Sequence, residues 1–125
     1  MKKLIHQLDG YFSKFIRQRD ADENGIVKCF TCETRNHWKE MDCGHFQKRQ
    51  HMATRYDEIN CQTQCKDCNW LKQGNDEVFA RNLEREYGYG TVERLKIKSR
   101  NKSKLDRFAL TMLIKQYKEL LKNKS

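Results

Sequence analysis

The chain carries Cys29-Phe30-Thr31-Cys32, then Gly44-His45, and then Cys65-Lys66-Asp67-Cys68-Asn69. Two Cys-x-x-Cys pairs can supply four thiolates to a closed tetrahedral zinc site, which holds a small fold together. The histidine and the asparagine lie inside or beside this frame and are not needed to complete it. The spacing therefore predicts a structural Zn²⁺ ion and leaves a histidine and an asparagine free for chemistry. The predicted zinc ligands are Cys29, Cys32, Cys65 and Cys68.

The other possible role for the second cysteine pair is a redox pair like that of thioredoxin. Such a pair needs a βαβ context, which the surrounding sequence lacks. The N-terminus has no unbroken apolar segment of the signal-peptide kind, and no apolar run approaches the ~20 residues of a membrane span. We therefore expect a cytoplasmic protein without a membrane partner, whose thiols stay reduced and bind metal. Cys43 and Cys61 stand apart, and each is either a replacement ligand or a small buried thiol.

The composition fits one small, basic domain. The chain has 125 residues, of which 37% are hydrophobic and 34% are charged, so its core must be thin. The formal net charge of +9 is the electrostatic footprint of a nucleic-acid binder. A ribosome-associated or merely basic protein has the same charge, and charge alone does not separate these classes. An acidic polymer is the expected partner, bound in a strongly salt-dependent way.

Hydrophobic periodicity divides the single domain, residues 1–125, into three parts. Residues 1–20 predict an amphipathic N-terminal helix, and residues 26–74 predict a zinc-braced core of short strands and one helix. Residues 75–125 predict a helical region, with Asn75 as the N-cap of its first helix. The expected fold is therefore α+β: a zinc-braced ββα-metal (HNH-like) core flanked by N- and C-terminal amphipathic helices.

The last predicted helix is long and amphipathic. Ser103 is its expected N-cap. Its expected buried stripe contains Leu105, Phe108, Ala109, Met112, Leu113, Tyr117, Leu120 and Leu121. Trp38 and Trp70, elsewhere in the chain, are expected in the core rather than as surfaces for stacking bases.

His45 follows a candidate strand and Asn69 begins a candidate helix, so the zinc frame fixes their separation. Hydrolysis of a phosphodiester needs an activated water, a cation on the scissile phosphate and stabilisation of the leaving oxygen. In a compact ββα-metal design, a histidine at the end of a strand is the general base and a helix residue binds one divalent ion. The pattern therefore predicts a metal-dependent phosphodiesterase. The simpler interpretations are a surface histidine at position 45 and a helix N-cap at position 69.

Further residues fall in the same register and carry a family resemblance. They are Asp42-x-Gly44-His45, Arg55-Tyr56-x-x-x-Asn60 and Gln64-Cys65-x-x-Cys68-Asn69-x-x-Lys72-x-Gly74-Asn75. Over roughly residues 11 to 95 the chain resembles the NinG (Rap) family of lambdoid phage recombination endonucleases. It is more distantly similar to phage endonuclease VII and the HNH superfamily. The resemblance implies a phage-encoded, structure-selective DNA endonuclease that acts in a bacterial host on Holliday junctions or D-loops, with phage recombination proteins as candidate partners.

The resemblance also implies roles for single residues. His45 matches the general base, and Asn60 matches the central asparagine whose amide pins the loop that orients the base. Asn69 matches the helix ligand of a catalytic Mg²⁺ or Mn²⁺. Endonuclease VII-like sites place an aspartate immediately before the histidine, where this chain has Gly44. Asp42, two residues earlier on the same face of an extended strand, is the expected carboxylate ligand. The simpler interpretation of Asn60 is a turn cap.

Basic residues are expected to supply the DNA-binding surface. Arg55 and Lys72 are predicted to clamp phosphates, with solvated surface charges as the alternative. A basic run is predicted to follow the DNA backbone, although such runs are usually solvated faces. The residues of the run are Lys96, Lys98, Arg100, Lys102 and Lys104.

Paired cuts in a two-fold symmetric junction need paired active sites, so a homodimer is compatible with the sequence.

Two other functional classes are compatible with the sequence. A non-catalytic zinc-finger DNA-binding module explains the cysteines and the charge, but it gives no role to His45, Asn60 and Asn69. An HNH homing or restriction-type endonuclease uses the same residues. Such an enzyme cuts linear duplex at a specific site without any preference for branches.

Overall fold

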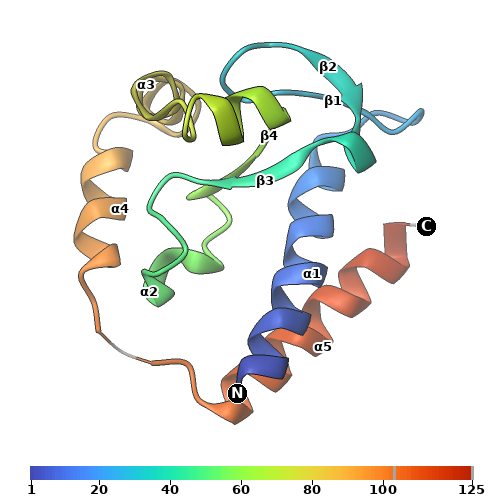
Figure 1. The fold of residues 1–125 in the computed structure, drawn as a ribbon. Coiled ribbons are helices and arrows are strands. Elements are labelled where there is room, and N and C mark those ends of the chain that lie inside the picture. Colours follow the sequence, from blue (N-terminus) through green and yellow to red (C-terminus); the bar gives the residue numbers. More distant parts are fainter. Residues whose placement is uncertain (103, 125) are drawn as a thin grey trace.

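The computed structural model describes residues 1–102 and 104–124, the side chain of residue 124 excepted. Helices and short strands alternate along the chain, which confirms a mixed α+β class (Figure 1). In chain order, the elements are α1 (Lys2–Arg19), β1 (Ile26–Lys28), β2 (Arg35–His37), the 3₁₀ turn η1 (Trp38–Glu40), β3 (Asp42–His45), α2 (Met52–Arg55), β4 (Cys61–Gln64), the π-helical turn η2 (Asp67–Leu71), α3 (Asp76–Tyr87), α4 (Thr91–Ser99) and α5 (Arg107–Lys124).

The strands form two small antiparallel sheets. β1 pairs with β2, and β3 pairs with β4 so that Asp42 lies opposite Gln64 and His45 lies opposite Cys61. The β3–β4 sheet lies in the middle of the molecule, against α1 (Figure 1). Two residues after β4 the chain enters η2, a short π-helical turn at the place where the sequence predicted the helix of the core.

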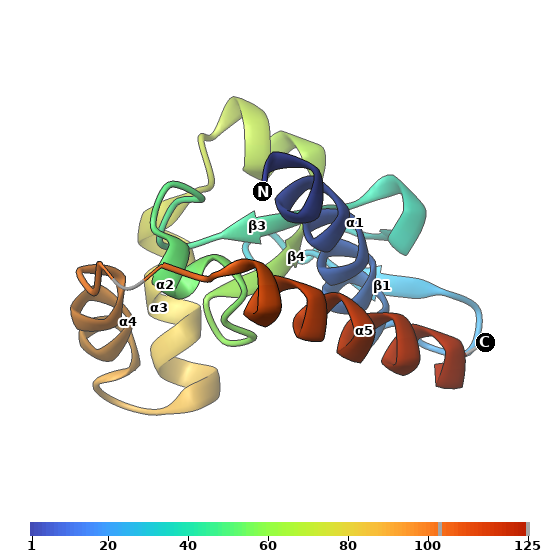
Figure 2. The same cartoon turned by 90° about the horizontal axis from the view of Figure 1, so that it is seen from below.

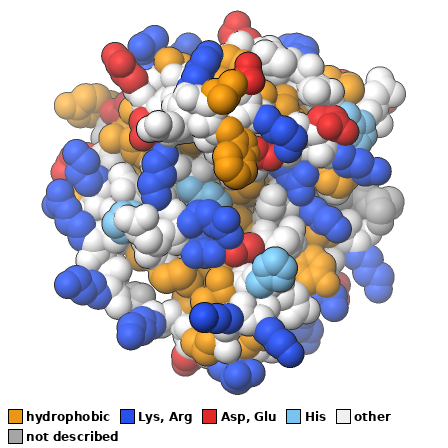
Figure 3. Space-filling model, in the orientation of Figure 1, with side chains coloured by type: hydrophobic (Ala, Val, Ile, Leu, Met, Phe, Trp, Pro, Cys, Tyr) orange, Lys and Arg blue, Asp and Glu red, His pale blue; other side chains and the backbone are white. Residues whose placement is uncertain are grey.

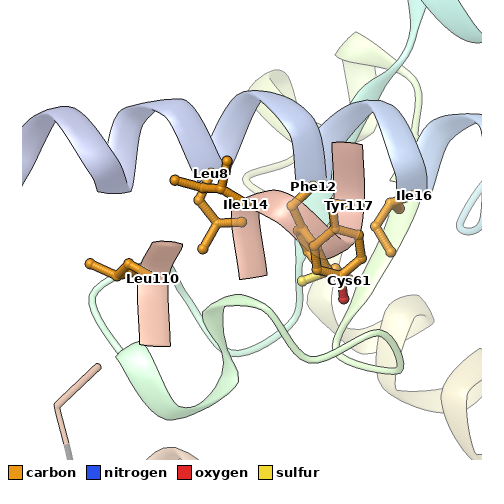
Figure 4. Packing of buried hydrophobic residues seen from close by; sticks show 7 residues of the cluster. All are labelled: Leu8, Phe12, Ile16, Cys61, Leu110, Ile114 and Tyr117. Atoms are coloured by element: carbon orange, nitrogen blue, oxygen red, sulfur yellow. The ribbon is translucent and has the colours of Figure 1, made fainter. Parts of the chain in front are cut away.

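The main core lies between α1, α5 and the β3–β4 sheet. The two terminal helices run side by side in both views (Figures 1 and 2). Burying a large apolar side chain stabilises the fold by about 1.5–3 kcal/mol, so this contact is a major part of its stability. The buried residues of this core are Leu8, Phe12, Ile16, Cys61, Leu110, Ile114 and Tyr117 (Figure 4).

The predicted details of the last helix were partly wrong. It begins at Arg107, and the Asp106 carboxylate accepts a hydrogen bond from the Ala109 amide at 2.8 Å, as an N-cap does. The expected cap, Ser103, lies outside the described residues. The predicted stripe included Phe108, whose side chain is 73% exposed. The helix has apolar residues on more than one face, and packing against α1 selects the face that carries Leu110.

The α3 and α4 helices form a second small core with Phe79, Leu83 and Leu95. Asn75 is the N-cap residue of α3, as the sequence predicts, but its side chain makes no capping hydrogen bond. Asn75 has a left-handed backbone with φ of 50°, and its side chain donates to the Thr31 carbonyl oxygen at 3.4 Å. Asn75 therefore ties the start of α3 to the first cysteine pair.

Candidate functional site

Four cysteines gather where β1 and β4 end, and we call them the four-cysteine cluster. The Sγ atoms of Cys29, Cys32, Cys65 and Cys68 all lie within 4.8 Å of one another. The Cys32 and Cys65 Sγ atoms are 3.5 Å apart. A tetrahedral zinc ion with bonds of ~2.3 Å holds its sulfur ligands about 3.8 Å apart, whereas a disulfide needs ~2.05 Å. The cluster therefore has the geometry of a metal site and can bind an ion such as zinc, as the spacing predicted.

The surroundings of the cluster prepare its thiols for a cation. Burial raises the pKa of Cys32, but hydrogen bonds with Thr34, Cys65 and Cys29 outweigh it and lower that pKa to about 6. The pKa of Cys65 is instead raised, first by burial and then by the neighbouring thiols, Cys32 among them. The cluster thus favours a thiolate at Cys32 and disfavours a second thiolate at Cys65. A divalent cation removes this repulsion, which is why thiol clusters of this kind release protons when they bind metal.

A second group of polar residues surrounds an open pocket of about 220 Å³, which we call the His45 pocket. An adjoining hollow of about 510 Å³ shares part of the same wall. Figure 3 shows many Lys and Arg side chains on the face of the molecule that is turned to the viewer in Figure 1. The residues lining the His45 pocket come from α1, β3, η2 and the segment after β3. They are Asp9, Phe12, Ser13, Asp42, Cys43, His45, Arg49, Asn69 and Trp70.

His45 is held as a neutral imidazole. Its Nε2 atom lies 3.0 Å from the Arg55 carbonyl oxygen. A carbonyl oxygen only accepts hydrogen bonds, so Nε2 carries the proton and Nδ1 keeps a free lone pair. Burial is the largest cause that lowers the pKa of His45, and the positive charges of Arg49 and Arg55 act in the same direction. Together they outweigh the raising effect of the Arg55 hydrogen bond and bring the pKa to about 4. At neutral pH the side chain can therefore accept a proton.

Asp42 and Asn69 are brought together beside His45. The Asn69 side-chain amide donates to Asp42 Oδ2 at 3.1 Å, and Trp70 Nε1 donates to the same oxygen at 3.0 Å. Lys66 Nζ lies 2.9 Å from the other carboxylate oxygen. A carboxylate and a side-chain amide offer the oxygen ligands that Mg²⁺ and Mn²⁺ prefer. Asp42 and Asn69 are therefore residue types that can ligate such an ion, and in this structure Asn69, Trp70 and Lys66 occupy the carboxylate oxygens.

The residue before His45 has a steric reason to be glycine. A Cβ atom at Gly44 would collide with the Gln64 side chain, which crosses from the paired strand β4. Gln64 is itself buried and donates to the Gly74 carbonyl oxygen at 2.7 Å. An aspartate in place of Gly44 would therefore require the buried Gln64 side chain to move, and Asp42 is the carboxylate that β3 brings to the pocket.

Asn60 is fully buried and fastens the loop between β3 and β4. Its Oδ1 accepts from the Gln47 amide at 2.7 Å, and its Nδ2 donates to the carbonyl oxygens of Gln47 and Thr54 at 3.1 and 3.0 Å. The loop so fastened presents the Arg55 carbonyl to His45. The simple turn-cap interpretation does not describe this geometry, because the side chain bridges both ends of a long loop.

Arg55 has a structural partner. Its guanidinium makes two hydrogen bonds to Asp9 of α1, at 3.0 and 2.6 Å, and its side chain is only 15% exposed. The phosphate-clamp role predicted for Arg55 therefore gains no support. The more exposed Arg49 also binds Asp9, at 2.6 Å, and it lines the His45 pocket.

The other basic residues lie on the surface. Lys72 is exposed just after η2. Lys96 and Lys98 are exposed on α4, which packs against α2 and α3, and Lys98 pairs with Asp57 at 2.6 Å. The rest of the predicted basic run follows α4 and is also exposed: Arg100, Lys102 and Lys104.

Asp9 and Trp70 are among the pocket residues that the sequence did not predict. Asp9 interrupts the amphipathic pattern of α1 next to buried Leu8. A charged residue so close to the apolar face is the sequence feature from which its role could have been predicted. Trp70, expected in the core, is 72% exposed, so that prediction was wrong. Cys68, in the same short turn η2, belongs to the four-cysteine cluster, and Trp70 lies at the rim of the His45 pocket. Trp38 is partly buried, as expected, with the Arg17 guanidinium over its ring.

Comparison with known protein families identifies a match. Residues 1–125 match the family described as "Bacteriophage Lambda NinG protein". No curated protein and no solved structure shows a significant match. Among the described residues, none of the helices combines the length and apolar character that crossing a membrane requires. Since the family match spans the whole sequence, the chain belongs to the bacteriophage lambda NinG family.

Proposed function

We propose that this protein is a metal-dependent endonuclease that cuts branched DNA and that the His45 pocket is its active site. One observation carries the proposal: a neutral imidazole with a free nitrogen lines the same pocket as an Asp42–Asn69 pair of oxygen donors. A hairpin, β3–β4, followed by the short helical turn η2 supplies these residues. This order is that of a ββα-metal (HNH-like) core, to which we assign it.

In the proposed mechanism, His45 Nδ1 takes a proton from the attacking water, while Nε2 stays bonded to the Arg55 carbonyl. Asp42 and Asn69 would hold one Mg²⁺ or Mn²⁺ ion, displacing the Lys66 and Trp70 donors from the carboxylate. When bound, such an ion neutralises charge on the phosphate and on the departing 3′ oxygen. Asn60 acts on the base indirectly, because it fixes the loop that supplies the Arg55 carbonyl.

The four-cysteine cluster has a positioning role in this proposal. Cys68 lies in η2, immediately before Asn69. A structural Zn²⁺ bound to Cys68 and to Cys29 after β1 would hold η2 in place beside β3. The cluster would then set the distance between Asn69 and Asp42 without contacting DNA.

The surface around the pocket supports a branched substrate. Trp70 lines the pocket, and the next residue, Leu71, is 81% exposed. Exposed Lys66 and Lys72 flank them in sequence. Unpaired bases at a branch can stack on an exposed aromatic ring, whereas bases inside an intact duplex cannot. The setting we propose is the cytoplasm of a bacterial host, with phage recombination proteins as partners and a homodimer for paired cuts.

The test compares cleavage of a labelled four-way junction with that of a linear duplex of matched sequence, in Mg²⁺, Mn²⁺ or EDTA. We expect metal-dependent cutting that favours the junction. Asp42→Asn should lower the cleavage rate at least about 100-fold, while the exposed control Glu77→Gln should cut normally.

Other outcomes identify the competing functions. Tight binding without cutting in either ion would point to a zinc-finger DNA-binding module. Cutting of linear duplex at one sequence, without any preference for the branch, would point to a homing or restriction-type HNH enzyme.

A further inference from the structure

A second group of metal-ligating atoms lies at the His45 pocket. The Sγ atoms of Cys43 and Cys61 and an imidazole nitrogen of His45 all lie within 4.8 Å of one another. His45 pairs directly with Cys61 across the β3–β4 sheet, and Cys43 is two residues before His45, on the same face of β3. We propose that these three residues form a binding site for a thiophilic ion such as Zn²⁺, and that this ion switches off the nuclease. The inhibitory part of this inference rests on the proposed function.

The chemistry of the three ligands selects the kind of ion. Two thiolates and an imidazole suit Zn²⁺ and other thiophilic ions, whereas Mg²⁺ and Mn²⁺ prefer oxygen. Three protein ligands leave a fourth tetrahedral position open, unlike the closed four-cysteine cluster. Cys43 and His45 line the pocket, so an ion can enter from there and reach Cys61, which is fully buried beneath them. Binding breaks two S–H bonds, forms two Zn–S bonds and releases both protons to solvent.

The two cysteines are better placed for a shared ion than for a disulfide. Cys43 lies opposite Thr63, not opposite Cys61, so the two cysteines are diagonal neighbours in the sheet. Diagonal neighbours have Cα atoms about 7–8 Å apart, beyond the usual disulfide range of about 4.4–6.8 Å. An ion with Zn–S bonds of ~2.3 Å spans the remaining gap between the sulfur atoms without moving the strands.

An ion at this site removes the proposed general base. A neutral imidazole has one free lone pair, and metal coordination uses it. Whichever nitrogen binds the ion, the other nitrogen carries the proton. His45 then cannot accept a proton from water. The oxygen donors Asp42 and Asn69 are left untouched, so two ions of different chemistry would act in one pocket with opposite effects.

The first test measures binding without reference to cleavage. Protein whose four-cysteine cluster is already filled with Zn²⁺ is titrated with Cd²⁺, and thiolate-to-metal absorbance and total metal content are recorded. We expect wild type to bind one ion more than Cys43→Ala and one more than Cys61→Val, which keeps a buried apolar side chain in the core. The exposed-histidine variant His6→Ala should match wild type. Equal metal content in wild type and both cysteine variants would overturn the site.

The second test measures inhibition. Junction cleavage is followed in saturating Mg²⁺ with rising free Zn²⁺, and each rate is divided by the zinc-free rate of the same variant. We expect Cys43→Ala to need more than about tenfold more Zn²⁺ for half-inhibition than wild type. Equal zinc sensitivity would refute inhibition through this site, even if the extra ion binds. If wild type cuts no DNA at all, the proposed function fails, and the Cd²⁺ titration still decides whether the site exists.

Discussion

The four-cysteine cluster and the His45 pocket are neighbours in the fold but differ in their surroundings and in the residues that form them. The cluster packs against apolar residues such as Val27 and Met41, and its four ligands are all cysteines. The pocket is open, and charged groups from α1, β3 and the segment after β3 line it. The difference indicates a division of labour, in which the cluster fixes positions and the pocket carries reactive groups. Changes in the cluster should therefore affect folding, and changes in the pocket should affect chemistry.

The largest expected effect comes from breaking the cluster. Cys68→Ser should abolish tight zinc binding and cooperative folding, because structural zinc sites contribute about 10–16 kcal/mol of apparent binding energy to the folded state. Thermal unfolding and metal content measure both losses. Cys43→Ser, which changes a cysteine outside the cluster, is the matched control and should keep the cluster's ion. A folded, stable Cys68→Ser protein would show that the cluster is dispensable.

Asn60 tests whether the pocket depends on the loop beneath it. Asn60→Ala removes three hydrogen bonds to Gln47 and Thr54 and leaves buried backbone groups without partners. We expect a loss of about 2–4 kcal/mol in the free energy of unfolding, measured in urea, together with slower cleavage. Asn24→Ala, in an exposed turn, should change neither quantity. If Asn60→Ala were as stable as wild type, the loop would be held by other contacts.

The sequence predicted the cluster more completely than the pocket, for a physical reason. A Cys-x-x-Cys turn sets its own geometry, so the spacing around Cys29 and Cys65 was enough to predict the ligands. Asp9 reaches the pocket only because α1 packs across the sheet, and that packing is a long-range property of the fold. The same cause explains the wrong buried face of α5, where Phe108 is exposed, and the unexpected exposure of Trp70.

Asp9 gives the pocket wall a pH dependence. Burial raises the pKa of Asp9, but hydrogen bonds and charge from Arg55, Tyr56 and Arg49 outweigh it, so the folded-state pKa lies below 3.8. A lowered carboxylate pKa stabilises the fold above the unfolded-state pKa and loses this effect as the pH falls through the folded-state value. Asp9→Asn should therefore cost about 1–3 kcal/mol at neutral pH.

Urea unfolding of wild type and Asp9→Asn at a series of pH values tests this role of the Asp9 charge. The stability difference between wild type and Asp9→Asn should shrink between about pH 5 and pH 3, as followed by urea unfolding. A difference that stays constant over that range would mean that the Asp9–Arg55 pair contributes through shape rather than charge. Asp20→Asn, a change to an exposed carboxylate, is the control.

The smallest expected effect on stability is at the pocket rim. Trp70→Ala should change the free energy of unfolding by less than about 0.5 kcal/mol, because its side chain is mostly exposed. Junction binding, measured by fluorescence anisotropy, should weaken by about 1–3 kcal/mol while duplex binding is unchanged. Trp70→Phe keeps a stacking ring but loses the hydrogen bond to Asp42, and Tyr89→Ala controls for loss of an exposed aromatic elsewhere. Equal losses on junction and duplex would exclude stacking at a branch.

The role of His45 as general base is tested most directly by the single-turnover rate at which His45→Ala cuts a four-way junction at saturating protein and Mg²⁺. Wild type and His6→Ala, a change to an exposed histidine on α1, are measured beside it. We expect His45→Ala to bind the junction and the cluster's zinc normally but to cut about 100- to 10,000-fold more slowly. Cleavage by His45→Ala at the wild-type rate would contradict the assignment of the His45 pocket as the active site.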